Sequence, residues 1–240
     1  MNPNIFRLSI ALAVVATIFS SCLKTDPPAP TTPPTYISVM HLAPSSPSLD
    51  VYFDNNKVST APLAPLNVTT AYNAVDRGYY AIKFKKAAGD SSVAEIPSAQ
   101  YDSLSFYTIF LYNLSTNGPV KAVRFKDDFT DVIANPTKPF YRFYHVSPNT
   151  GAVDFYINDV KLESSRQYAD NVGFDPRNKF LVGQTDYNKM EVKLAGTDTV
   201  IASLQNAYMT AGNAYTIYLK GLEGGTGTNE LSLGMLRAAN

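Results

Sequence analysis

The chain contains no tryptophan, one cysteine and two histidines among its 240 residues. A single cysteine cannot form a disulfide within the chain. Neither histidine has a cysteine, a second histidine or an acidic cluster beside it at metal-ligand spacing. Nucleophile elbows, phosphate-binding loops and dinucleotide fingerprints are missing too. The sequence therefore predicts no catalytic residue, no metal and no cofactor, and we expect a protein that is not an enzyme.

An excess of charge of either sign is also missing. Lysine and arginine number 20, aspartate and glutamate number 20, and no basic block stands out along the chain. A protein that binds nucleic acid needs a basic stripe to displace counterions from the phosphates. Nucleic acid is therefore excluded as an expected partner.

Long apolar runs are limited to residues 8–19, which follow Arg7. This run is shorter than the roughly 20 residues that span a bilayer and is typical of an export signal. It ends in Ser-Ser-Cys at residues 20–22, which resembles a bacterial lipobox, although Phe19 stands where leucine is commonest. We expect a lipoprotein signal peptide over residues 1–21 and acylation of Cys22, since two or more acyl chains anchor a protein stably. An ordinary signal peptide with an unrelated cysteine is the alternative.

Prolines crowd the segment that follows the cysteine. Residues 22–35 contain five prolines, separated by threonine and alanine. Such a segment favours an extended spacer of about 3.1 Å per residue. We therefore expect a membrane-anchored stalk. The outer membrane is the favoured location, with the periplasmic and the surface-exposed face both open.

One stretch of the chain occurs twice. Residues 39–53 recur as residues 143–157, so that equivalent residues are separated by 104 positions. The pairs are His41 and His145, Pro44 and Pro148, Asp50 and Asp154, Tyr52 and Tyr156, and Lys57 and Lys161. This recurrence predicts a duplicated domain.

Alternating apolar and polar residues predict short strands throughout both copies. Residues 80–84 match 190–194 at an offset of 110, residues 106–111 match 214–219 at 108, and residues 120–125 match 230–237. The glycine cluster at residues 221–227 joins two such strands and is interpreted as a hairpin loop. The pattern favours an all-β fold of two tandem Ig-like antiparallel β-sandwich domains, over residues 36–136 and 137–240.

The His-x-Ala/Ser-Pro element, the following Asp-Val/Phe-Tyr strand and the Tyr-Thr-Ile-aromatic-Leu strand together resemble the DUF4397 family of bacterial envelope proteins. The resemblance extends from Tyr36 to about Arg237. It implies tandem domains behind a lipoprotein signal of the kind found in Bacteroidota, and it implies no activity.

His41, Asp50, His145 and Asp154 are the candidate site residues, because the duplication repeats them. They are interpreted either as ligand contacts or as structural residues. In the structural interpretation, each histidine bonds to the loop that follows its strand, and each aspartate bonds to the loop that holds its histidine. The second interpretation is the favoured one.

Aromatic residues could form a platform on which a sugar ring stacks. Tyr79, Tyr80, Tyr141 and Tyr144 are the candidates for such a platform. Half-buried sheet faces select tyrosine in any case, and tryptophan, the stronger stacking residue, is missing. A structural role is therefore favoured for each.

These patterns predict a lipid-anchored cell-envelope protein that acts as a non-enzymatic binding or adhesion module. Its expected partners are the membrane, through the anchor, and a glycan or an envelope protein. A structural subunit of an envelope or surface-layer complex is the alternative, and an enzyme is a third.

Overall fold

The computed structural model describes residues 32–68, 72–172 and 175–239. The expected signal peptide, the acylation site Cys22 and the linker up to residue 31 lie outside the described residues. Pro33–Asn240 forms one compact unit. The predicted limits of the two domains therefore stay a prediction, and the two parts of this unit are called the first and second halves.

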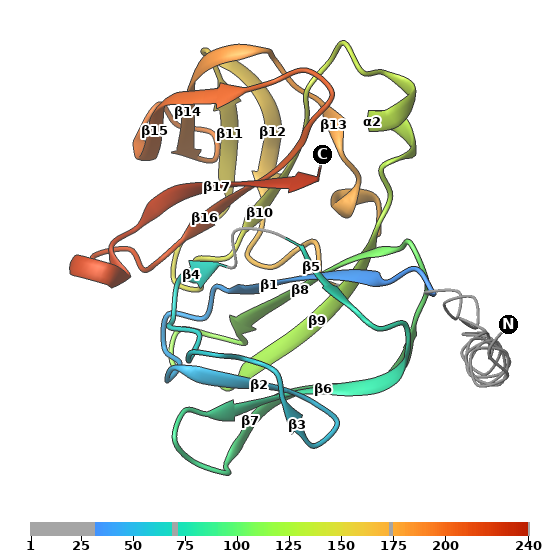
Figure 1. The fold of residues 1–240 in the computed structure, drawn as a ribbon. Helices are drawn as coiled ribbons and strands as arrows, with labels where there is room; N and C mark the ends of the chain where they lie inside the picture. The colour runs from blue at the N-terminus through green and yellow to red at the C-terminus, as the bar shows by residue number, and fades with distance from the viewer. Residues whose placement is uncertain (1–31, 69–71, 173–174, 240) are drawn as a thin grey trace, which may run out of the picture. The chain divides into compact units, whose positions relative to one another are not determined.

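The described residues of the first half form nine strands in two sheets, and Figure 1 shows their arrangement. The strands are β1 (Thr35–His41), β2 (Leu49–Phe53), β3 (Asn56–Lys57), β4 (Asn67–Val68), β5 (Asn73–Val75), β6 (Gly78–Lys86), β7 (Ser92–Tyr101), β8 (Phe106–Asn113) and β9 (Val120–Asp127). One sheet has the order β4-β1-β8-β9, with β5 also pairing with β1, and the other has the order β3-β2-β6-β7.

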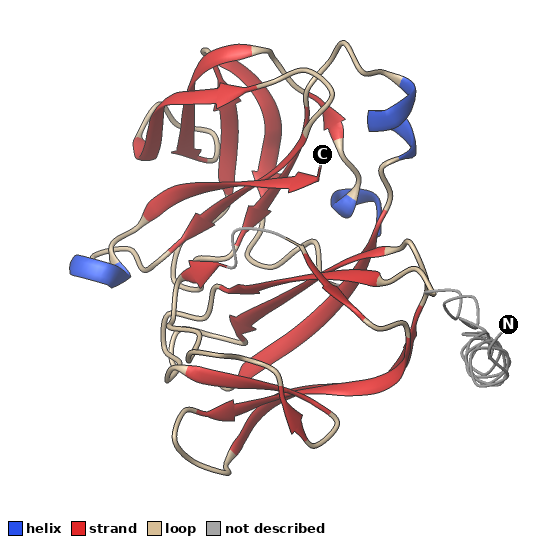
Figure 2. Ribbon diagram, viewed as in Figure 1, coloured by secondary structure: helices blue, strands red, loops and turns tan. Residues whose placement is uncertain are grey.

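The second half repeats this plan after the short helix α2 (Thr130–Ala134). Its strands are β10 (Phe140–His145), β11 (Val153–Ile157), β12 (Val160–Arg166), β13 (Leu181–Val182), β14 (Asp186–Leu194), β15 (Val200–Met209), β16 (Ala214–Lys220) and β17 (Ser232–Ala239), with 3-10 turns η1 (Asp175–Asn178) and η2 (Gly227–Asn229). The sheets have the orders β13-β10-β16-β17 and β12-β11-β14-β15. Strands dominate the described residues, as Figure 2 shows, and the predicted all-β sandwich class is confirmed.

Two strand pairs are parallel, which the sequence did not indicate. β1 lies parallel to β8, and β10 lies parallel to β16, while the other pairings between strands are antiparallel. Parallel neighbours need a long connection between them. The whole second sheet of each half supplies that connection.

The strand register corrects one predicted alignment. Val51 pairs with Phe84, and its equivalent Phe155 pairs with Val192. Phe84 and Val192 are therefore equivalent at an offset of 108, and the predicted offset of 110 for this strand is wrong by two residues. Because side chains alternate with a period of two along a strand, a slip of two keeps every residue on its predicted face. The alternation in the sequence could not reveal the error.

The change of offset marks where the halves differ. The offset is 104 through β2 and β11, and it is 108 by β5 and β13, since Tyr36 pairs with Ala74 and Phe140 pairs with Val182. The second half therefore has four more residues (108 − 104) between its first hairpin and β13. It uses this segment to extend β12 to seven residues, where β3 has two.

The sheets that contain β1 and β10 are buried on both faces. In β8, Tyr107, Ile109 and Leu111 pack into the core of the first sandwich. The alternate residues Phe110 and Tyr112 pack into a separate cluster shared with the second half. Strands buried on both faces carry near-continuous apolar runs. This accounts for the Phe-Tyr-Thr-Ile-Phe-Leu-Tyr sequence of β8.

The shared cluster is built from equivalent positions of the two halves. It contains Met40 and its equivalent Tyr144, Leu42 and Val146, and Phe110 and Tyr218. The rings of Phe110 and Tyr144 lie 5.4 Å apart. Each half therefore presents the same patch to the other, as in the self-complementary interface of a two-fold dimer.

Candidate functional site

Both histidines lie at the end of the first strand of their half and are fully buried. His41 Nε2 lies 3.2 Å from the Pro47 carbonyl oxygen, and His145 Nε2 lies 3.0 Å from that of Gly151. Each carbonyl belongs to the loop after the strand, as the structural interpretation requires. Whether either histidine also binds a ligand stays a prediction.

The partners of His145 define its protonation state. A carbonyl can only accept, so Nε2 carries the proton and donates it to Gly151. The backbone N–H of Ser147 lies 3.4 Å from Nδ1, which therefore accepts. Burial lowers the pKa of His145 and of His41 below the ordinary value, and backbone hydrogen bonds only partly oppose this. Both imidazoles are neutral near pH 7.

The aspartates do not bond to the histidine loops, and that part of the prediction is wrong. Asp50 pairs with Lys57 at 2.9 Å, and Asp154 pairs with Lys161 at 2.6 Å. Asp154 also accepts a hydrogen bond from the backbone N–H of Ser165. The reason is the hairpin register, because each lysine lies diagonally across from its aspartate on the next strand. The carboxylates stabilise the hairpins.

The structure does not gather the candidate residues into one centre. Each histidine and each aspartate bonds within its own half. Within residues 32–68, 72–172 and 175–239, no group of three His, Cys, Asp or Glu side chains is placed to hold a metal ion.

The four candidate tyrosines differ in their exposure to solvent. Tyr141 and Tyr144 are buried, so they offer no surface to a sugar. Tyr80 stacks between Phe53 and Tyr101. Tyr79 alone of the four is largely exposed, at 71%. A platform built from all four is therefore excluded.

A buried ion pair between the halves was not predicted. Arg142 on β10 contacts the Asp127 carboxylate at the end of β9, and both side chains are at most 1% exposed. The guanidinium also donates to the hydroxyls of Thr108 and Thr216, which are equivalent residues of the two halves. Burial opposes the charge of Arg142, but Asp127 together with the neighbouring Tyr144 and Tyr72 more than offsets this and holds the Arg142 pKa above its ordinary value. These contacts join the halves.

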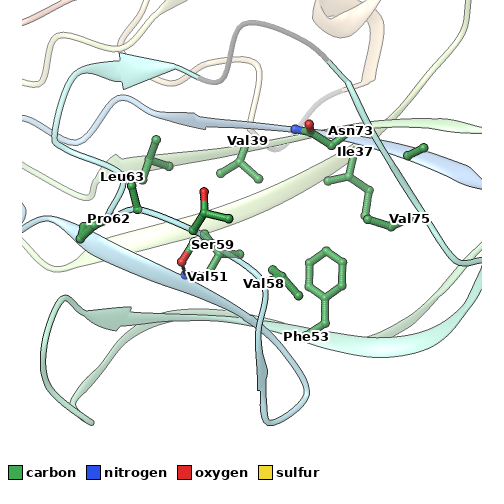
Figure 3. Close-up of a pocket in the computed structure, with 13 residues that line it drawn as sticks. Ile37, Val39, Val51, Phe53, Val58, Ser59, Pro62, Leu63, Asn73 and Val75 are labelled. Carbon is green, nitrogen blue, oxygen red and sulfur yellow. Dashed lines mark hydrogen bonds between the residues drawn. The ribbon is translucent and has the colours of Figure 1, made fainter.

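An apolar cavity lies at one edge of the first sandwich, between β1 and β5 on one side and β2 with residues 58–63 on the other (Figure 3). We call it the edge cavity, and its volume is about 540 Å³. Ile37, Val39 and Val51 form its inner wall. Of the described residues that line it, none carries a charge. Its size and apolar walls are typical of small-molecule sites.

Sequence reasoning missed the edge cavity, although a signal for it was present. Val39 and Val51 are equivalent to Phe143 and Phe155 at the offset of 104. The first half has aliphatic side chains at two matched positions where the second half has aromatic rings. Smaller side chains at matched core positions predict unfilled space in the first half.

The fold and the cavity together define an all-β sandwich protein with an open apolar site at a sheet edge. Residues 35–156 match the model of the family described as domain of unknown function (DUF4397), which covers half of the chain. The chain belongs to this family. No curated protein matches it. No helix in the described part of the chain is long and apolar enough to cross a membrane.

Proposed function

We propose that this protein is a lipid-anchored component of a Bacteroidota-type cell envelope. In this proposal it carries two tandem DUF4397 copies and acts as a non-enzymatic binding or adhesion module. The edge cavity is the observation that carries the binding role, because it is open in one half while the equivalent region of the other half is filled. The repeated sheet orders support the duplication. The Ser-Ser-Cys sequence supports the anchor.

The anchor has a direct test in cells grown with radiolabelled palmitate. The wild-type protein should incorporate label, and Cys22→Ala should not, because the cysteine is the site of acylation. Equal labelling of the two proteins would contradict the anchor. Protease treatment of intact cells then decides between the two faces of the membrane, since only a surface-exposed chain is cut.

The binding role is tested without assuming a ligand. The full chain carrying Cys22→Ala is incubated with a total extract of the cell envelope and washed. Bound compounds are then released by denaturation and identified by mass spectrometry. We expect the protein to retain a compound that is lost when Val58, which lines the cavity and is 46% exposed, is changed to aspartate. A protein that retains no compound would contradict the binding role.

A structural subunit of an envelope or surface-layer complex is the second candidate. The observation that favours it is β13, an edge strand that exposes Leu181 and Val182. Unpaired edges with apolar side chains are where a partner strand adds. Crosslinking in cells should then co-purify a partner in stoichiometric amount, and Val182→Lys should remove it.

A further inference from the structure

Three buried side chains that line the edge cavity are smaller than their equivalents in the second half. The equivalent pairs, each 104 positions apart, are Ile37 and Tyr141, Val39 and Phe143, and Val51 and Phe155. In the second half the rings of Phe143 and Phe155 stack with centroids 4.6 Å apart. The first half has aliphatic side chains at both positions. Where rings fill the second sandwich, the first has open space.

The chain after the hairpin closes the second sandwich but not the first. In the second half Arg166 pairs with Val153, and its guanidinium lies 5.6 Å from the Phe143 ring centroid. In the first half Leu63 takes the equivalent place opposite Leu49. Residues 58–63 line the cavity there instead of continuing as a strand.

The rest of the first core is not underpacked. Val51 faces Phe84 across the strand pair, whereas its equivalent Phe155 faces Val192. Large and small side chains are thus exchanged between the two strands. Phe84 and Ile82, on the inner strand β6, are fully buried. The smaller side chains therefore lie toward the edge, where a ligand can enter, while the inner strand β6 keeps its large side chains buried.

The cavity continues along the edge as a groove. A second cavity of about 530 Å³ adjoins it and shares Phe53, Val58, Ala74 and Val75 with it. The far end of the groove carries the carboxylates of Asp54 and Asp76, both on exposed residues. An elongated apolar groove fits an extended chain. The carboxylates at its end accept hydrogen bonds from hydroxyls and repel an anionic group.

We propose that the edge cavity binds the aliphatic chain of an uncharged lipid, with a hydroxyl-bearing headgroup at Asp54 and Asp76. This inference rests on the proposed binding function and names the ligand class for that site. Burial of the chain supplies the affinity, at about 25 cal/mol per Å² of apolar surface removed from water. The carboxylates select a neutral headgroup over a fatty-acid anion or a phosphate.

The experiment uses the full chain with Cys22→Ala, which removes the predicted acyl chains that would compete for the groove. The probes are monopalmitoylglycerol and palmitate, which share one chain length and differ in headgroup charge. Binding is measured by displacement of the uncharged dye N-phenyl-1-naphthylamine, and stoichiometry by native mass spectrometry. We expect one monopalmitoylglycerol per protein and affinity for palmitate that is weaker by roughly tenfold or more.

Two variants locate the site. Val58→Asp places a charge in the groove and should weaken monopalmitoylglycerol binding roughly tenfold or more, because a carboxylate would be desolvated against the chain. Val160→Asp is the matched control, since Val160 is equally exposed and lies outside the groove. Val39→Phe restores the ring found in the second half and should also abolish binding. If Val39→Phe does not fold, the comparison of the two aspartate variants still shows whether the ligand binds in the groove.

The outcomes separate this inference from the proposed function. Unchanged binding in Val58→Asp, or equal affinity for palmitate, would overturn the inference. Failure to bind monopalmitoylglycerol would also overturn it. If the envelope extract nevertheless yields a polar or anionic compound that depends on Val58, the binding function stands with another ligand class. If the extract also yields no bound compound, both the lipid inference and the proposed binding function are contradicted.

Discussion

The buried ion pair and the two buried histidines of this protein each have specific partners. Arg142 and Asp127 are paired, while each histidine bonds to a carbonyl of its own loop. Buried polar groups depend on such partners because water cannot replace them. Removal of one partner should therefore lower the free energy of unfolding by more than the bond contributes, because the other group stays buried and unpaired.

Arg142→Met should lower the free energy of unfolding by about 3–5 kcal/mol, because it leaves the Asp127 carboxylate buried without its cationic partner. Lys126→Met is the control, since it breaks the solvent-exposed pair with Asp102 and should cost far less. Both values come from urea unfolding. Adding Asp127→Leu to Arg142→Met should recover much of the loss, and equal losses in both single variants would contradict the role of the buried pair.

The buried histidines should make stability depend on pH. Their folded-state pKa values lie below 6.5, so on acidification the unfolded state binds protons first. Their contribution to stability is therefore present above about pH 6.5 and falls as the pH drops toward the folded-state values. Urea unfolding at intervals between pH 7.5 and 5 measures the slope. The slope should flatten in a variant with His41→Gln and His145→Gln, and an unchanged slope would assign it to other groups.

At the scale of elements, the strands between the two halves pack one face into their own sandwich and the other face against the opposite half. β16 packs Tyr215 and Ile217 into its own sandwich, while Tyr218 faces the first half. Gly234 on β17 pairs with Tyr218, and a Cβ at Gly234 would overlap the Tyr218 ring. The glycine is thus needed for close approach.

Gly234→Ala should therefore displace the Tyr218 ring and lower the free energy of unfolding by about 1–3 kcal/mol, as overpacking does. Gly151→Ala is the matched control, because a Cβ there meets nothing within 4 Å. Thermal melting followed by circular dichroism compares the two. A cost at Gly151 equal to that at Gly234 would contradict displacement of the Tyr218 ring as the cause.

The element boundaries were largely predictable, and the register was not. The strands over residues 36–41, 49–53 and 153–157 and their tight turns lie where alternation and turn residues placed them. The offset of 110 failed because a slip of two residues preserves every face. Only the hydrogen-bonded pairing of Phe155 with Val192 distinguishes the two alignments.

At the scale of the whole described unit, the two sandwiches share two buried clusters, one around Phe110 and one around Phe129, and a buried ion pair. The patch that each half presents is built from equivalent positions. Because the inner sheets are covered on both faces, neither half can expose its patch without uncovering apolar surface. The halves should therefore unfold together.

Phe110→Ala tests this coupling. The substitution removes a fully buried ring from the shared cluster and should cost about 3–5 kcal/mol. Hydrogen exchange followed by mass spectrometry should show weaker protection in strands of both halves, β8 and β16 included. Tyr79→Ala, at an exposed position, should change neither the free energy of unfolding nor the protection of the strands from exchange. Loss of protection confined to the first half would show that the sandwiches unfold independently.

The sequence by itself determined the all-β class and the repeated His-x-x-Pro motif with its two histidines, because period-two alternation and repeated motifs are local properties of the chain. The aspartate partners, the Arg142–Asp127 pair and the edge cavity were decided by tertiary structure. Each depends on which side chains meet across sheets, and contacts between residues far apart in sequence leave no local pattern. The edge cavity is predictable in part from the sequence, because side chains of unequal size occupy matched positions of the two halves. Its place at the sheet edge is set only by how the strands pack.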